Sequence, residues 1–261
     1  MTEENLFDEE ASILKDAETS FRHLLQSSKD IVQRSLTHLS EERELFDQAM
    51  ILQLAFIGWA TRGGLITDDG LRAAIALACY TFDMLLCGWN SLIHGFYAVA
   101  VHSIRSIDQA TVTGVAVTLD PDIARKFWED KLDNGDAAKA LQRAIEEEDP
   151  DFGRDWGKRR LKIRDVFHKF AHPGRAAVSP SIVIAADYQS GAPKAGGFFV
   201  EKQCIQIGRL YADLAFKAAV DASQAFKTVL PPDGDLKPQF DQLVEWGKPL
   251  IDSWEKEMGF S

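Results

Sequence analysis

The sequence lacks the short motifs that mark the common nucleotide-binding and hydrolytic enzymes. It has no Gly-x-x-x-x-Gly-Lys-Ser/Thr loop, no Gly-x-Gly-x-x-Gly after a predicted strand and no Gly-x-Ser-x-Gly elbow. Such segments supply the backbone N–H groups that hold phosphates, or the sharp turn that exposes a catalytic serine. Their absence argues against a nucleotide-binding fold and against a hydrolase of the usual kinds.

Cysteine and positive charge are both scarce. The three cysteines, Cys79, Cys87 and Cys204, have no paired spacing, so the sequence predicts neither a disulfide framework nor a zinc ribbon. The 29 Lys and Arg residues are outnumbered by 40 Asp and Glu residues, which gives a net charge of -11. A field of this sign repels phosphate, so any binding to nucleic acid must be local.

The pattern of charged and apolar residues along the sequence also shows neither a secretory signal nor a clear membrane span. Residues 1–5 are acidic, where a secretory signal would be basic. The most apolar stretch, residues 84–101, is nearly long enough to cross a bilayer, but it contains Asn90 and His94 and closely follows Asp83. We interpret it as a buried core helix, and we expect a cytoplasmic protein without a membrane partner.

Hydrophobic residues make up 46% of the 261-residue chain and recur at three- and four-residue steps over most of it. This period predicts a mainly α fold, a multi-helix bundle that forms a single helical domain over residues 1–261. Its expected parts are an N-terminal helical hairpin (8–63), a core bundle (67–175) and C-terminal helices (204–258). Residues 181–186 and 197–200 flank a loop containing glycine and proline, which predicts a two-stranded β-hairpin near residues 181–200 (180–202 with its flanks).

Several residues predict where helices begin, end or cross. Ser40 is expected to cap one helix, and Thr67-Asp68-Asp69 and the pair Asp120-Pro121 are expected to open two others. Gly88 or Gly95 is the expected place for a break or a close helix crossing inside the apolar region, because glycine permits both.

The helix predicted over residues 155–172 contains the most chemically suggestive group. At the helical period, Arg164, His168 and His172 gather on one side, opposite an aromatic face. Histidine exchanges protons near neutral pH and arginine stabilises phosphate, so these three are the candidate catalytic residues. The alternative is structural, because histidines also suit the C-terminal end of a helix.

Metal chemistry is not favoured at this helix. The spacing His168-x-x-x-His172 is one that zinc uses, but Lys169 stands where a zinc-protease helix has glutamate. No set of four ligands can be assembled from the sequence. We therefore expect no metal site and no cofactor.

Two further groups have both a functional and a structural interpretation. Arg105 and Asp108, on a predicted helical stripe with His94, are either a buried ion pair or part of a ligand-binding pocket completed by His172. The second group is a candidate nucleic-acid-binding surface formed by three neighbouring cations, Lys158, Arg159 and Arg160. Its alternative is a solvated helix face that balances the acidic run over residues 146–149.

Two resemblances rest on these residues. Arg105-Ser106-Ile107-Asp108 together with the helix end at His172-Pro173 resembles a family of uncharacterised prokaryotic helical proteins, in which His168 stands where serine is usual. More remotely, the chain resembles the HEPN helical domains, some of which cleave RNA as dimers with an Arg and a His on one helix. There four to six residues separate the pair, whereas three separate Arg164 from His168.

These observations leave three hypotheses for function. The first is a helical-bundle protein that acts by binding a ligand, a protein or a nucleic acid, in a prokaryotic stress or phage-defence setting. The second, implied by the HEPN resemblance, is a metal-independent ribonuclease that works as a homodimer, with RNA as its partner. The third is a metal-binding helical bundle. Whether the chain is an enzyme stays open at this point.

Overall fold

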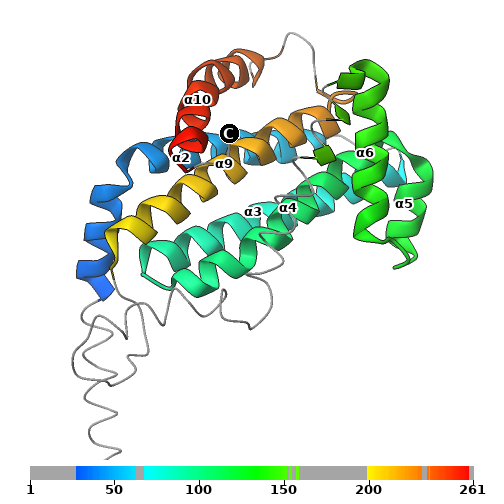
Figure 1. Cartoon of the computed structure of the whole chain (residues 1–261). Coiled ribbons are helices and arrows are strands. Elements are labelled where there is room, and N and C mark those ends of the chain that lie inside the picture. The colour runs from blue at the N-terminus through cyan, green and yellow to red at the C-terminus, as the bar shows by residue number, and fades with distance from the viewer. Residues whose placement is uncertain are drawn as a thin grey trace, which may run out of the picture.

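The protein is a helical bundle. The computed structural model describes residues 28–62, 68–151, 153–154, 157–158, 199–230, 234 and 236–258. A helical segment, residues 28–38, leads into a series of helices that Figure 1 labels: α2 (Ser40–Ala60), α3 (Asp69–Ile93), α4 (Tyr97–Leu119), α5 (Pro121–Trp128), α6 (Asn134–Glu148), α9 (Glu201–Ala225) and α10 (Leu236–Met258). The predicted all-α bundle is therefore confirmed.

The predicted β-hairpin near residues 181–200 finds no support. None of the described residues lies in a strand, and Phe199 and Val200 lead directly into α9. Residues 181–198, which would form most of the hairpin, lie outside the described residues.

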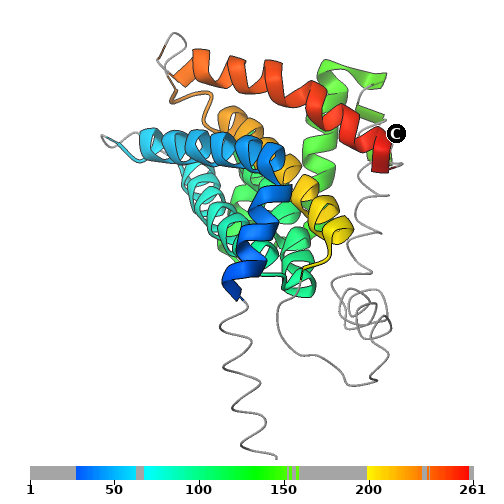
Figure 2. The ribbon, with the colours of Figure 1, turned by 90° about the vertical axis from the view of Figure 1, so that its left-hand side faces the viewer.

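Helix α9 lies at the centre of the arrangement and packs against α2, α3 and α4. Helices α3 and α4 form the most extensive pair, while α10 crosses over α2 and α9 on one side of the bundle (Figures 1 and 2). Helices α5 and α6 lie together at one end. The core contains large side chains sealed from solvent, such as Tyr97, Tyr211 and Phe226.

Helix starts follow the local sequence closely in two of the three predicted places. Asp68 accepts a hydrogen bond from the Leu71 amide at 2.7 Å. Asp120 precedes α5 and accepts a hydrogen bond from the Asp122 amide at 2.9 Å, and Pro121 follows it in the first turn of the helix. Such caps satisfy N–H groups that a helix start leaves unpaired. Both predicted caps are confirmed.

The predicted cap at Ser40 is wrong. The residue before α2 is Leu39, without a side-chain cap, and the Leu39 amide donates to the Ser35 carbonyl at 3.0 Å. Arg43 in turn donates to the Leu39 carbonyl at 2.8 Å, so helical hydrogen bonding continues from residues 28–38 into α2. A helix that is not interrupted has no unpaired N–H groups for a serine to cap.

The two glycines of the apolar region do two different things. Gly95 has a φ of 76° and ends α3, so the chain can turn back into α4. Gly88 lies in the middle of α3, where an added Cβ would be 1.8 Å from the Tyr211 hydroxyl. The sequence predicted a break or a close crossing at one of them, and the structure has one of each.

Candidate functional site

The whole predicted catalytic group lies outside the described residues. This holds for Arg164, His168 and His172, and also for Arg159 and Arg160 of the predicted cationic surface. Lys158 is described and is exposed. The acid–base and nucleic-acid roles of these residues stay predictions.

Arg105 and Asp108 are both half-buried on α4, so neither is sealed in the core as a buried ion pair would be. The predicted stripe with His94 is wrong, because α3 ends at Ile93 and Gly95 separates His94 from α4. The helical phase that aligns Arg105 with Asp108 does not extend across that turn. A ligand-binding role for Arg105 and Asp108 stays a prediction.

Asp108 belongs to a charge cluster that the sequence did not reveal. Lys217 Nζ lies 2.6 Å from Asp213 Oδ2 on its own helix, α9, and 3.9 Å from Glu255 Oε1 on α10. Desolvation lowers the pKa of Lys217, but Asp213, Glu255 and Asp108 outweigh it and the pKa is raised. Lys217 therefore stays cationic and links three helices, which suits a structural role and not that of a base. Only the Asp213–Lys217 spacing was visible in the sequence.

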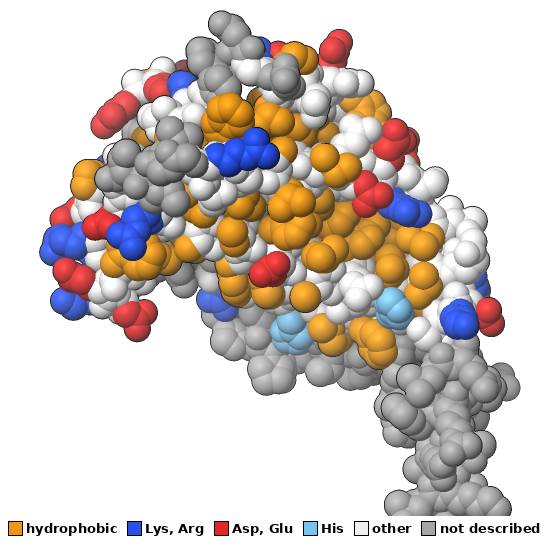
Figure 3. All heavy atoms as spheres, turned by 180° about the vertical axis from the view of Figure 1, so that it is seen from behind, with side chains coloured by type: hydrophobic (Ala, Val, Ile, Leu, Met, Phe, Trp, Pro, Cys, Tyr) orange, Lys and Arg blue, Asp and Glu red, His pale blue; other side chains and the backbone are white. Residues whose placement is uncertain are grey.

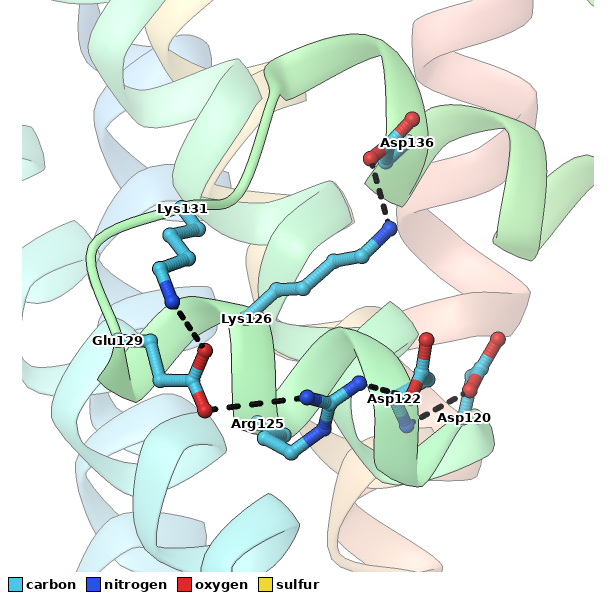
Figure 4. A network of polar contacts seen from close by, with 7 residues as sticks. All are labelled: Asp120, Asp122, Arg125, Lys126, Glu129, Lys131 and Asp136. Carbon is cyan, nitrogen blue, oxygen red and sulfur yellow. Dashed lines mark hydrogen bonds and ion pairs between the residues drawn. The ribbon is translucent and has the colours of Figure 1, made fainter.

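A second charge network covers α5 and the start of α6 (Figure 4). Arg125 lies between Asp122, at 2.6 Å, and Glu129, at 3.8 Å, while Lys126 reaches Asp136 at 3.1 Å. Every charge in these pairs has an opposite partner at the surface. The network holds α5 against its neighbour and leaves no group aimed at a ligand.

The α5 network gives a titration prediction. The Arg125 guanidinium lowers the pKa of Asp122 by its hydrogen bond and by its charge. We expect Arg125→Ala to return the Asp122 pKa to the ordinary aspartate range, and Lys126→Ala, a weaker influence, to move it less. NMR titration of the Asp122 carboxyl carbon measures both. An unchanged Asp122 pKa in Arg125→Ala would show that the ion pair does not form in solution.

No group of three or more His, Cys, Asp or Glu side chains within the described ranges is arranged to hold a metal ion.

A small cavity, lined mostly by apolar side chains with a few polar ones, lies between α2, α3, α4 and α9. Its volume is about 20 Å³, and its lining includes Gln53 and Thr81, which are 1% and 0% exposed. The Gln53 amide donates to the Ala78 carbonyl at 3.3 Å, but Gln53 Oε1 and Thr81 Oγ1 have no hydrogen-bond partner among the described residues. One water needs about 10–15 Å³ and two or more polar partners. We therefore expect an ordered water in this cavity.

The cavity gives a stability prediction. Gln53→Met keeps the side-chain length and removes a polar group that is only partly hydrogen-bonded, so the free energy of unfolding should change by less than about 1 kcal/mol. Gln53→Ala enlarges the cavity and should cost about 2–3 kcal/mol. Urea unfolding of both variants measures the difference. Equal losses would mean that the amide is held by interactions stronger than those described.

The surface of α3 exposes large apolar side chains, as parts of α2 and α4 also do. Its outward side consists of eight exposed residues, which we call the α3 face: Arg72, Ala76, Cys79, Tyr80, Asp83, Leu86, Cys87 and Asn90. Leu86 is 50% and Tyr80 is 46% exposed. Seen from behind, the molecule has a broad area of hydrophobic side chains with few charges among them (Figure 3).

Charge on the α3 face is sparse and of both signs. Beyond Asp69, the helix has two charged residues, Arg72 and Asp83. Partial burial, and then the Asp83 carboxylate, raises the pKa of the neighbouring Cys79. Asp83 itself has no hydrogen bond or ion pair among the described residues. The described part of the chain offers no cation to this carboxylate, which lies amid exposed apolar side chains.

The exposure of this region corrects the prediction of a buried helix over residues 84–101. The structure ends the helix within that range and leaves Leu86, Phe96 and Val99 exposed by 44–58%. Apolar spacing shows that a helix side avoids water, but it does not show whether the covering surface belongs to the same chain.

Length and composition alone would also let α3 cross a membrane, and it is the one such helix in the described part of the chain. In the bundle, 44% of its most apolar window is buried.

Comparisons with protein-family models, with curated proteins and with solved structures give no match. The resemblances to the uncharacterised prokaryotic family and to the HEPN domains stay predictions. The α3 face is therefore the candidate functional site.

Proposed function

We propose that the protein acts by binding, that the α3 face is its protein-binding surface, and that a second copy of the chain occupies this face in a homodimer. The observation that carries the proposal is the exposure of Tyr80 and Leu86 on a helix side with three charged residues, Asp69, Arg72 and Asp83. Monomeric proteins seldom expose a contiguous apolar patch of more than a few hundred Å² unless it binds something.

The energetics favour a modest but specific interface. Burying the exposed half of a large apolar side chain contributes about 1 kcal/mol. A stable protein interface buries about 800 Å² on each partner, which is more than one helix side provides. Exposed apolar residues on neighbouring elements, such as Phe96, Val99 and Trp128, can supply the remainder.

A second copy suits the α3 face better than an unrelated partner does. In a twofold dimer the same surface meets itself, so each charged residue needs an opposite charge on that same surface. Arg72 and Asp83 meet this requirement, because Arg72 of each copy can keep its own Asp69 and also face the other copy's Asp83, which has no ion pair among the described residues.

Sedimentation velocity of the full chain over a wide concentration range tests the proposal. The unaltered chain is expected to dimerise as its concentration rises. Leu86→Lys places a charge in the apolar face and should raise the dissociation constant at least tenfold, whereas Gln242→Lys, which adds the same charge to the exposed surface of α10, should leave it unchanged. A chain that stays monomeric, or equal effects of the two variants, would contradict the proposal.

A further inference from the structure

The exposed residues of the α3 face follow a repeat that pairs helices. Ala76, Cys79, Asp83, Leu86 and Asn90 are separated by steps of three and four residues. This spacing keeps one seam of a helix facing a neighbouring helix over its whole length. The seam therefore predicts a helix as the covering element, and in a dimer that helix is α3 of the other copy.

The two charges select the direction of pairing. Arg72 and Asp83 lie about three helical turns apart on the same side of α3. A parallel twofold arrangement would place Asp83 opposite Asp83 and Arg72 opposite Arg72, and like charges opposed in an interface are costly. An antiparallel arrangement can place Arg72 of each copy opposite Asp83 of the other.

We propose that the α3 helices of two copies pack antiparallel, with Arg72 of each copy bound to Asp83 of the other. This inference rests on the proposed function. The pairing of Arg72 with Asp83 fixes the register of the two helices. Ala76 of one copy then lies opposite Cys79 of the other, and the twofold axis passes between residues 77 and 78. The small side chain of Ala76 lets the helices approach closely at that axis.

The surroundings of Arg72 are compatible with this pairing. Its guanidinium reaches Asp69 at 3.2 Å and lies over the Trp128 ring, 5.7 Å from the centroid, while most of the side chain remains exposed. A guanidinium has five N–H donors, so Arg72 can keep Asp69 and also bind a second carboxylate. The Asp83 carboxylate of the other copy would be the second partner.

Trp128 gives the register an independent apolar contact. Its indole Nε1 donates to the Asp69 carbonyl at 3.0 Å, which fixes the ring beside the first turn of α3. In the proposed register, Leu86 of one copy lies opposite Asp69 in that turn of the other copy, beside the Trp128 ring. Two half-exposed side chains, Leu86 at 50% and Trp128 at 48%, therefore cover one another.

Cross-linking through the native cysteines tests the register. With the axis between residues 77 and 78, the two Cys79 positions differ by about 5 Å along the helices, whereas the two Cys87 positions differ by about 28 Å. A bis-maleimide spanning about 10 Å, the distance between packed helices, should link Cys87→Ser chains through Cys79 but should not link Cys79→Ser chains. Cys204 is buried and serves as the unreactive third thiol.

Charge exchange tests the same register without a reagent. Asp83→Arg and Arg72→Asp should each raise the dimer dissociation constant about tenfold or more, because like charges then face each other, and the double variant should restore it. Thermal unfolding of each variant checks that the bundle stays folded.

The outcomes separate the register from the proposed function. If Leu86→Lys weakens the dimer but Cys87 cross-links, or the double variant does not recover, the register is wrong and the binding function stands. If the unaltered chain stays monomeric and neither thiol cross-links, both fail. Flotation of the chain with phosphatidylcholine vesicles, without dimerisation, would assign the face to a membrane surface and overturn both.

Discussion

Gly88→Ala is expected to lower the free energy of unfolding by about 3 kcal/mol, because inserting a methyl group into a closely packed core forces its neighbours to shift. The new Cβ would lie 1.8 Å from the Tyr211 hydroxyl and 2.4 Å from its ring carbon Cζ. Tyr211 is fully buried and cannot move outward. Its hydroxyl donates to the Ala100 carbonyl at 2.6 Å and lies 2.6 Å from the Ser103 hydroxyl. Displacing the ring breaks these bonds as well.

Gly58→Ala is the matched control for Gly88→Ala. Gly58 also lies inside a helix, but an added Cβ meets no atom within 4 Å. Alanine is favoured over glycine in a helix by about 0.5–1 kcal/mol, so this variant should be neutral or slightly more stable. Urea unfolding measures both. If the two variants have the same stability, α3 and α9 do not cross as closely as described.

Arg209→Met is expected to destabilise the protein by about 3 kcal/mol, because it leaves the buried Glu42 carboxylate without its cation. Arg209 on α9 binds Glu42 on α2 at 3.2 Å and Glu257 on α10 at 2.5 Å. The Glu42 side chain is 5% exposed and that of Arg209 is 20% exposed. Desolvation lowers the pKa of Arg209, but hydrogen bonds to Glu257 and Glu42 outweigh it and the pKa is raised. The guanidinium therefore remains charged.

Two further variants isolate the cause. Glu257 is 57% exposed, so Glu257→Ala should cost less than about 1 kcal/mol, as exposed ion pairs usually do. The double variant Glu42→Leu/Arg209→Met removes both buried charges and should recover most of the stability. Chemical unfolding of the set measures the coupling. A double variant as unstable as Arg209→Met alone would mean that lost packing against Trp254, and not the unpaired charge, causes the loss.

Local features of the fold were predictable from the sequence, and features set by packing were not. The caps at Asp68 and Asp120 depend on a few adjacent residues, so their sequence signal was sufficient. At Ser40 the same signal failed, because the helix continues through Leu39. For Gly88 and Gly95, composition indicated an unusual backbone site, but only the position of Tyr211 distinguishes the crossing from the break.

In the candidate site, too, local features were predictable from the sequence and features set by packing were not. The apolar composition of residues 84–101 predicted the helix that contains Leu86, but it assigned that helix to the buried core. The link between Asp108 and Lys217 depends on how α4 and α9 pack, and no sequence spacing encodes it.

Thiol labelling tests directly whether a second copy covers the α3 face. Cys79 and Cys87 are exposed on this face, and Cys204 is buried elsewhere. We expect brief maleimide labelling of Cys79 to slow, without stopping, as the chain concentration rises through the dimer dissociation constant, while prolonged treatment with the bis-maleimide still links the two copies. The Leu86→Lys chain should show no such slowing. A labelling rate that stays constant while sedimentation shows dimers would contradict the account, because the copies would then meet through another surface.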